Sequence, residues 1–529
     1  MVNYELTINN LLESSVKANE DQEIVYDNKR INYKEFYKNV NNFAKNLLKI
    51  GVKKEDRIAI LDYDTINYMY CYYSIPMIGA TMHMVNIRYP PEILYYTIEN
   101  SDDRYIIVNS AFMPIIAKYK DMFSFIKGFI IYSENKDEPE ENYGLDNVYY
   151  THNMFGDTGY EIEKPGEDSM ATLFYTSGTT GLPKGVYYSH RQLVLHALAA
   201  VSALADEPIT LRKTDAMMPL VPMFHVHAWG IPYFSIMKGM KYVLPGKYDW
   251  QNILKTMEKE NVTLSAMVPS ILYMLLSEKN GPEILGKLKL RATIGGAALN
   301  SGLADKAEAI GLSLITGYGM SETGPILTMA TYNNYIAKMD DEAKRIYKRK
   351  TGIPIPMVNL RVVKDDHDVK KDDSEIGEII VKAPWLTEGY IKDPEKTEKL
   401  WRNGWLHTGD LATMDQYKYI KIVDRENDAV KSGGEFIPSM VLEDLLSTVN
   451  GVDEVAVVAR KDEKWGERPV AFIKGNAKED DIRKKMEEYV DTGRIAKFWL
   501  PDEYKYIENF EKTGTGKIDK KVLRERLGD

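Results

Sequence analysis

Apolar residues in the N-terminal part of the chain alternate between helical and strand spacing. From Phe36 to Leu48 they recur every three or four positions, and Gly51 is placed to end the helix that this spacing predicts. Arg57 to Leu61 then forms a short apolar run typical of a buried strand. The alternation continues downstream, which predicts a large α/β body. Further strands are predicted at residues 106–108, 129–132, 264–268, 292–294 and 312–315.

The pattern changes after a charged stretch at residues 340–349. Apolar runs at 353–363 and 378–381 are β-rich and predict a small sheet or barrel. Beyond Asp424 the elements suffice for an α+β domain of about 100 residues. They are strands at 455–459 and 470–473 and helices at 480–490 and 520–527. The predicted domains are a body at residues 1–424, a hinge at 425–428 and a mobile C-terminal domain at 429–529.

The composition of the chain limits which binding partners and which cellular compartment we expect for the protein. The 68 lysine and arginine residues are outnumbered by 78 aspartate and glutamate residues, and the net charge of −10 argues against nucleic acid as the main partner. Apolar runs stay well short of the ~18 residues of a membrane span, and Glu5 and Glu13 stand near the start without a basic leader. These features predict a cytoplasmic protein with no membrane span. The single cysteine, Cys71, lies in an apolar stretch and is predicted to pack in the core.

Residues 175–185 read YTSGTTGLPKG, and such a density of hydroxyls and glycines is typical of polyphosphate binding. The hydroxyl and backbone N–H groups donate hydrogen bonds to phosphate oxygens, and a lysine adds positive charge. A surface turn is the alternative, but a predicted strand at 171–175 and a helical pattern at 192–200 flank the loop. A Walker loop needs GxxxxGK followed by serine or threonine, and this loop lacks that order. The candidate phosphate ligands are Thr176, Ser177, Gly178, Thr179, Thr180, Gly181, Lys184 and Gly185.

Five further motifs follow this loop in order. They are residues 295–299 (GGAAL), 317–323 (GYGMSET), 408–410 (TGD), 424–435 (DRENDAVKSGGE) and 512–517 (KTGTGK). With them, the chain resembles the adenylate-forming superfamily of acyl-CoA synthetases, luciferases and peptide-synthetase adenylation domains over nearly its whole length. The resemblance implies an α/β body with two sheets and a small β barrel, and a small mobile α+β C-terminal domain. It also implies ATP, Mg²⁺ and coenzyme A as ligands, a carboxylic acid as substrate and a possible homodimer.

The resemblance assigns several motif residues to the nucleotide. Tyr318 can stack on adenine, and Gly296 with Ala297 leaves room for adenine to approach the backbone. Asp410 offers two acceptors to the ribose hydroxyls, with the donor fork of Arg425 beside it. Structural turns and surface charges are the alternative roles for these positions. The remaining nucleotide contacts that the resemblance implies are Thr316, Gly317 and Ser321.

The resemblance also implies a metal site and a catalytic lysine. Glu322 and Thr176 are the expected Mg²⁺ ligands, because this hard cation takes oxygen ligands and retains waters. A helix cap is the alternative for Glu322. Lys517 corresponds to the lysine that enters the active site during adenylation and contacts the substrate carboxylate and the α-phosphate. Its alternative is an exposed lysine in a turn.

Four positions bear on the predicted domain movement. Asn427 occupies the hinge position of the superfamily. Gly433 and Gly434 resemble the loop that faces the active site during thioester formation, and Lys431 can pair with phosphate. Ordinary turn or surface roles are the alternatives for the last three residues.

Residues 222–233 (PMFHVHAWGIPY) resemble medium- and long-chain fatty-acid–CoA ligases most closely. Amino-acid-activating relatives have aspartate at the position of His225, so a free carboxylic acid is favoured here, and His225 is a candidate to orient its carboxylate. Val226 and Trp229 match positions that line or gate a fatty-acyl tunnel. A structural histidine and core packing are the alternatives. His227 stands where close relatives often have asparagine, which leaves chain length and tolerance of an ω-hydroxyl open.

We therefore predict an AMP-forming acyl-CoA synthetase with Lys517, Glu322 and His225 as catalytic residues. It would convert a medium- or long-chain fatty acid and Mg-ATP into acyl-AMP and pyrophosphate, then transfer the acyl group to coenzyme A. The alternatives are an acyl-AMP ligase that loads a carrier protein, a short-chain or hydroxy-acid CoA ligase, and an inactive nucleotide-binding homologue.

Overall fold

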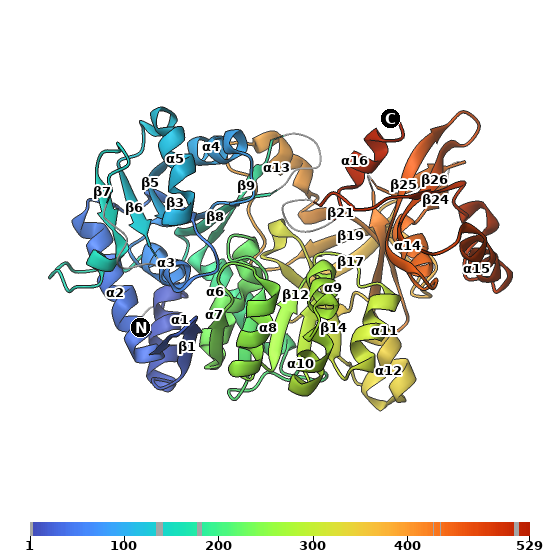
Figure 1. Cartoon of the computed structure of the whole chain (residues 1–529), viewed down its shortest axis with the longest axis horizontal. Helices are drawn as coiled ribbons and strands as arrows, with labels where there is room; N and C mark the ends of the chain where they lie inside the picture. The colour runs from blue at the N-terminus through green and yellow to red at the C-terminus, as the bar shows by residue number, and fades with distance from the viewer. Residues whose placement is uncertain are drawn as a thin grey trace.

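The computed structural model of the chain describes residues 4–133, 141–176, 182–426, 428–433, 435–512 and 518–528. The described strands form four sheets. Figure 1 shows the N-terminal part of the chain (blue) at one end of the molecule and the C-terminal part (red) at the other. None of the helices in these ranges is long and apolar enough to cross a membrane.

The seven-stranded sheet is parallel except for its last pair, β8 and β9. Its strand order is β7 (Val148–Tyr150), β6 (Gly128–Tyr132), β5 (Asp103–Asn109), β3 (Arg57–Leu61), β4 (Thr81–Met84), β8 (Met170–Thr176) and β9 (Lys184–Ser189). Its helices are α2 (Tyr33–Lys49), α3 (Ile66–Met77), α4 (Pro91–Asn100) and α5 (Met113–Lys118). The predicted apolar face of α2 is buried, and Asn32 caps this helix by accepting a hydrogen bond from the main-chain N–H of Glu35. Cys71 on α3 is fully buried, as predicted, and burial raises the pKa of its thiol.

The nine-stranded sheet has a parallel centre and antiparallel edges. Its strand order is β16 (Ile353–Pro354), β15 (Ile326–Met329), β14 (Ser313–Gly319), β13 (Arg291–Ile294), β12 (Leu264–Met267), β10 (Ala216–Leu220), β11 (Lys241–Leu244), β1 (Glu23–Tyr26) and β2 (Lys29–Asn32). The accompanying helices are α1 (Ile8–Ala18), α6 (His190–Ala203), α7 (Ile231–Lys238), α8 (Trp250–Lys259), α9 (Pro269–Ser277), α10 (Gly281–Leu288), α11 (Ser301–Ala309) and α12 (Asp341–Tyr347). Helix α6 begins two residues before the predicted pattern because Ser189 and Gln192 form a capping box.

The β-rich segment forms a six-stranded antiparallel sheet. Its strands are β18 (His367–Asp368), β17 (Asn359–Lys364), β19 (Gly377–Lys382), β21 (Trp405–Met414) and β20 (Trp401–Arg402), with β22 (Ile420–Arg425) paired to β21. Helix α13 (Pro394–Leu400) precedes β20.

The C-terminal part has a five-stranded sheet and its own apolar core, which includes Leu446, Val457, Ile473 and Met486. The strands are β24 (Glu435–Ile437), β23 (Val430–Ser432), β26 (Gly466–Gly475) and β25 (Val452–Asp462), with β27 (Glu503–Tyr506) paired to β26. The helices are α14 (Ser439–Ser447), α15 (Glu479–Asp491) and α16 (Lys520–Glu525), and the last is shorter than predicted. The domain boundaries at 424 and 429 stay a prediction.

Candidate active site

Predicted site residues lie at the carboxyl ends of the strands β10, β13 and β14. Ile294 pairs with Thr316, so residues 295–297, which follow β13, come beside residues 317–318 in the last part of β14, where that strand pairs with β15. At Gly295, a Cβ atom would lie 3.1 Å from the Trp229 ring and 3.2 Å from the carbonyl oxygen of Gly317, so a larger residue would have to displace these neighbours by a few tenths of an ångström. Gly296 follows with a φ of +76°, in the left-handed region. Open α/β sheets bind ligands at this edge.

The predicted base-stacking and ribose-binding residues lie together. The Tyr318 hydroxyl donates a hydrogen bond to Asp410 Oδ2 at 2.6 Å, and Arg425 Nε lies 3.3 Å from Asp410 Oδ1. Asp410 and Arg425 are direct partners across β21 and β22. Burial, reinforced by the charge of Asp410, raises the pKa of Tyr318, so its hydroxyl stays protonated and donates. Three segments distant in sequence thus present one aromatic ring, one carboxylate and one guanidinium.

Thr316 and Ser321 also lie in this region, but their polar groups have structural partners. The Thr316 hydroxyl donates to the carbonyl oxygen of Lys350, and the Tyr188 hydroxyl donates to the carbonyl oxygen of Ser321 at 2.6 Å. Both contacts fix the backbone that carries Tyr318 and Glu322.

Glu322 is a buried carboxylate, 7% exposed, on the short helix η5 (Ser321–Thr323). The Tyr390 hydroxyl donates to Glu322 Oε1 at 2.6 Å, and the Lys184 ammonium lies over the Tyr390 ring, 4.8 Å from its centroid. Burial and the neighbouring Glu322 raise the pKa of Tyr390, which keeps this donor protonated. Tyr390 therefore joins the predicted metal ligand to the predicted phosphate-binding lysine.

Thr176 and Lys184 are register partners at the end of the β8–β9 hairpin, so they flank the glycine-rich loop. Within the described ranges, no group of three or more His, Cys, Asp or Glu side chains is placed to hold a metal. One carboxylate and one hydroxyl nevertheless fit Mg²⁺, because this ion prefers oxygen ligands and takes few from protein when phosphates and waters supply the rest. Glu322 and Thr176 would be the ligands that the protein supplies to Mg²⁺.

Two family models cover most of the chain. The model described as AMP-binding enzyme matches residues 12–391, and the model described as AMP-binding enzyme C-terminal domain matches residues 441–517. The chain belongs to the AMP-binding enzyme family. The resemblance to adenylate-forming enzymes drawn from its motifs is thereby confirmed.

Relatives of this AMP-binding enzyme match it over nearly its full length. It is 34% identical to a long-chain-fatty-acid–CoA ligase of Thermus thermophilus, with 94% of this chain and 90% of the relative covered. It is 33% identical to a 3-methylmercaptopropionyl-CoA ligase of Ruegeria lacuscaerulensis, over 100% of this chain and 98% of the relative. An anthranilate CoA ligase in complex with anthranoyl-AMP superposes with a TM-score of 0.85 at 20% identity, covering 99% and 98% of the two chains. The predicted α/β body with a smaller C-terminal domain is confirmed.

Residues 222–233 of this AMP-binding enzyme are predicted to contact the acyl group and are called the acyl segment below. They contain an unusual turn. Val226, His227, Ala228 and Trp229 have φ angles of 45°, 55°, 45° and 60° in succession, followed by Gly230 at 77°. The left-handed conformation costs roughly 1–2 kcal/mol for each residue other than glycine. Packing around the segment must therefore hold the turn in place.

Trp229 lies between Gly295, in the GGAAL motif, and an apolar cavity. Its ring faces Gly295, it is 9% exposed, and it lines the cavity together with Met217, Phe234 and Met329. The lining is apolar apart from Thr293. The volume is about 20 Å³, room for roughly one water molecule, so the cavity is nearly closed in this conformation.

The start of the acyl segment is anchored from the seven-stranded sheet region. Asp64 Oδ1 accepts a hydrogen bond from the main-chain N–H of Met223 at 2.7 Å, and the Tyr72 hydroxyl donates to the carbonyl oxygen of Met223 at 2.5 Å. Tyr248 donates to the other oxygen of Asp64 at 3.0 Å. Half-buried His225 follows two residues later, and its carbonyl oxygen accepts from the N–H of Ala228 at 2.9 Å.

The predicted residues of the C-terminal part pack within their own sheet. The main-chain N–H of Lys431 donates to Glu467 at 2.7 Å, and the N–H of Gly433 donates to the carbonyl oxygen of Trp465 at 2.8 Å. The remaining predicted site residues lie outside the described residues: Ser177, Gly178, Thr179, Thr180, Gly181, Asn427, Gly434 and Lys517.

Sequence reasoning missed Tyr390. It lies 68 residues after Glu322 in a stretch without a motif, and the pairing of Val186 with Tyr390 brings it to the hairpin that carries Lys184. The anchors Asp64 and Tyr72 were missed for the same reason, since a contact to a distant backbone leaves no local pattern.

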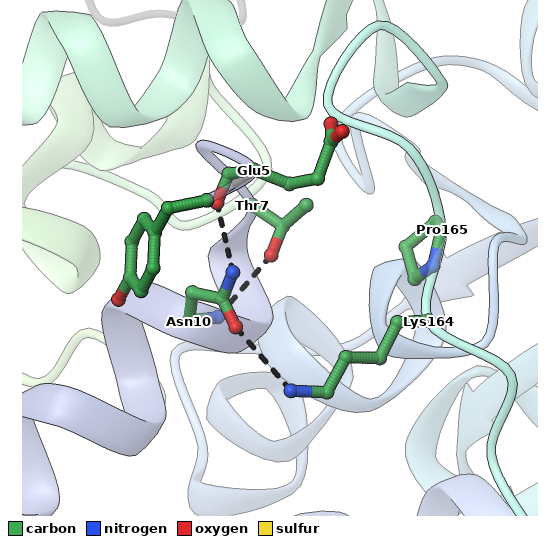
Figure 2. A pocket seen from close by; sticks show the side chains of 6 residues that line it. Glu5, Thr7, Asn10, Lys164 and Pro165 are labelled. Atoms are coloured by element: carbon green, nitrogen blue, oxygen red, sulfur yellow. Dashed lines mark hydrogen bonds between the residues drawn. The ribbon is translucent and has the colours of Figure 1, made fainter. Parts of the chain in front are cut away.

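Figure 2 shows a larger pocket, of about 260 Å³, near the N-terminus. Asn10 lies at its centre: its N–H donates to Thr7 Oγ1 at 3.2 Å, its amide donates to the carbonyl oxygen of Glu5 at 2.8 Å, and Lys164 donates to its Oδ1 at 3.4 Å. None of the predicted site residues lines this pocket.

Proposed function

We propose that this AMP-forming acyl-CoA ligase acts on a medium- or long-chain fatty acid. The observation that carries the substrate class is the position of Trp229, which lies against Gly295 of the nucleotide motif on one side and lines an apolar cavity on the other. An acyl chain that displaced the indole would enter apolar surroundings while its carboxylate stayed near the nucleotide. The long-chain-fatty-acid–CoA ligase among the relatives supports the same class.

The enzyme uses ATP, Mg²⁺ and coenzyme A in two steps. The substrate carboxylate attacks the α-phosphorus of ATP, a phosphorus–oxygen bond to pyrophosphate breaks, and acyl-AMP forms. The thiol of coenzyme A then attacks the acyl carbon and AMP leaves. The carboxylate is already ionised, so the protein's task is to position the reactants and stabilise charge.

Each residue of the site has a proposed part in these steps. Tyr318 and Asp410 hold the adenosine, Lys184 neutralises charge on the phosphates, and His225 orients the substrate carboxylate. Glu322 and Thr176 would hold Mg²⁺, which when bound neutralises charge that develops on the phosphates. Lys517 serves adenylation, and the segment with Lys431 and Gly433 serves thioester formation after the C-terminal domain turns about Asn427.

The test of the proposal is ATP–pyrophosphate exchange with a panel of acids, followed by CoA-dependent release of AMP. The panel runs from short thioether and hydroxy acids to fatty acids of about 6 to 18 carbons, because apolar pockets discriminate by only about 1–3 kcal/mol per methylene. Strongest exchange with fatty acids supports the proposal. A preference for the short polar acids would overturn the substrate class. Adenylate formation without CoA-dependent AMP release would indicate a carrier-protein ligase, and ATP binding without exchange an inactive homologue.

The Trp229→Ala enzyme is expected to lose chain-length preference while keeping its ATP turnover. Removing the indole opens the apolar cavity, so acids that the wild type disfavours by about tenfold should be used nearly equally, a change of about 1–2 kcal/mol. The measurement is kcat/KM for acids of different length in the exchange assay, with Trp405→Ala as the matched control, since half-buried Trp405 on β21 packs against Arg361 and Lys382 and not against the acyl segment. An unaltered profile would remove the gating role.

Replacing Asp410 by alanine is expected to raise KM for ATP about 10- to 100-fold, the scale of losing hydrogen bonds to a charged group. KM for the acid should change little, since Asp410 pairs with Tyr318 and Arg425 on the nucleotide side. Steady-state exchange at varied ATP measures this. Asp372→Ala, at an exposed turn whose carboxylate pairs with Ser374, is the control. An unchanged KM for ATP would rule out the ribose-binding role.

A further inference from the structure

We propose that Thr172 and His227 are positioning residues for acyl selection, because their hydrogen bond fixes the left-handed turn that carries Trp229. This inference rests on the proposed function, and it names these two residues as the ones that set the enzyme's preference for acyl chain length. The bond joins His227 Nε2 to Thr172 Oγ1 at 2.7 Å, and both residues are fully buried.

The local conformational preferences of its residues do not favour this turn. Four residues in succession, Val226 to Trp229, adopt a left-handed conformation that only glycine adopts without steric cost, and glycine appears only at position 230. Within the turn, the N–H of Ala228 donates to the carbonyl oxygen of His225 at 2.9 Å. Contacts from outside the segment must supply the remaining stabilisation, and strain of this kind concentrates at functional sites.

His227 supplies contacts of this kind. Its ring packs edge-on against Phe174 and Tyr188, with centroids 5.2 Å away in each case, in addition to the bond to Thr172. Burial and the nearby His196 lower the pKa of His227, so the imidazole is neutral. Its Nδ1 has no hydrogen-bond partner among the described residues. The single polar link of this side chain is therefore the one to Thr172.

The partners of His227 belong to the hairpin that flanks the phosphate loop. Thr172 and Phe174 lie on β8 and point to the same face as Thr176, since side chains two residues apart share a face of a strand. Tyr188 lies on β9. The turn itself follows β10 of the other sheet, so His227 connects the acyl segment to the hairpin across the boundary between two sheets.

With Met223 held by Asp64 and Tyr72, the acyl segment is fixed at two points, and Trp229 stands two residues beyond the second. Rotation of the turn about this second point would carry the indole away from Gly295 and change the size of the apolar cavity. The Thr172 hydroxyl therefore determines how firmly Trp229 closes the cavity.

The test is a matched pair at Thr172. Thr172→Val keeps the shape and removes the hydroxyl, whereas Thr172→Ser keeps the hydroxyl and removes a methyl group. In the exchange assay, Thr172→Val should lower the kcat/KM ratio between the preferred acid and one four carbons shorter by about three- to tenfold, the scale of one hydrogen bond. KM for ATP should stay within about twofold of wild type, and Thr172→Ser should restore the wild-type ratio.

A second pair keeps the inference testable if Thr172→Val fails to fold. His227→Gln places an amide near the position of Nε2 and should retain the wild-type acid ratio, whereas His227→Asn is too short to reach Thr172 and should lose it. A thermal melt accompanies each variant. A lower Tm and a uniform loss of activity with an unchanged acid ratio and unchanged KM for the acid would overturn the inference and leave a purely structural bond. If the wild-type enzyme showed no ATP–pyrophosphate exchange with any acid, the proposed function would be refuted instead. The wild-type enzyme is therefore assayed before any variant.

Discussion

Replacing Lys517 by alanine is expected to slow acyl-adenylate formation roughly 10²- to 10³-fold, the scale of losing one donor that stabilises a transition state. Lys517 ends the KTGTGK motif, and the resemblance assigns its ammonium to the substrate carboxylate and the α-phosphate. Both groups carry negative charge that shifts during in-line attack, so a cation at this point acts mainly in the transition state. ATP–pyrophosphate exchange measures this half-reaction alone.

The second half-reaction separates a catalytic role from a structural one. Thioester formation from supplied acyl-adenylate should survive in the Lys517→Ala enzyme, because the proposed two-step scheme uses this lysine only for adenylation. Lys521→Ala is the matched control, since Lys521 is exposed on helix α16 and pairs only loosely with Glu525, at 3.8 Å. Comparable losses in both half-reactions would contradict the division of labour between the two faces of the C-terminal domain.

The contacts between the C-terminal part and the body are compatible with such a turn. Asp444 Oδ1 accepts hydrogen bonds from both the N–H and the hydroxyl of Ser301, each at 2.9 Å, where α14 meets α11 (Figure 1). Asp424 Oδ2 accepts from the N–H of Ser439 at 2.6 Å, next to the predicted hinge. A small apolar cluster also joins Leu411 and Val423 of the body to Ala429 and Val441. Small or polar interfaces within a chain open more readily than large apolar ones. The first contact can break during a turn, whereas the second lies close enough to the hinge to persist.

The secondary structure could be predicted where periodicity was strong. Helix α2 and strand β3 appear as their apolar spacing predicts, because the amphipathic face of a helix and a buried run are local properties. Which strands pair with one another, by contrast, is not a local property of the sequence. The hairpin β1–β2 pairs with β11 of the nine-stranded sheet, so Ile24 lies opposite Tyr242, and nothing in either segment encodes that distance in sequence.

The residues of the candidate site likewise fall into those that the sequence could predict and those that it could not. Tyr318, Asp410 and Arg425 stand in recognisable motifs, and the structure brings them within hydrogen-bond or ion-pair distance. Tyr390 and Thr172 act through contacts with partners far along the chain, and neither stands in a motif. The turn at residues 226–230 contradicts local preference outright, because valine, alanine and tryptophan disfavour left-handed angles. Tertiary packing decides its conformation.

Replacing Glu322 by glutamine is expected to lower adenylation about 10²- to 10³-fold and to raise the Mg²⁺ concentration needed for half-maximal exchange. Glutamine keeps the size of the side chain and can still accept the hydrogen bond from Tyr390, so the loss isolates the carboxylate charge. Tyr390→Phe is the matched control: it leaves Glu322 charged and keeps an aromatic ring beneath Lys184, and it should cost about tenfold or less. The measurement is a Mg²⁺ titration of exchange for all three enzymes. If the Glu322→Gln enzyme kept the wild-type dependence on Mg²⁺, the carboxylate would be only a structural partner of Tyr390. That result would contradict a metal-binding role for Glu322.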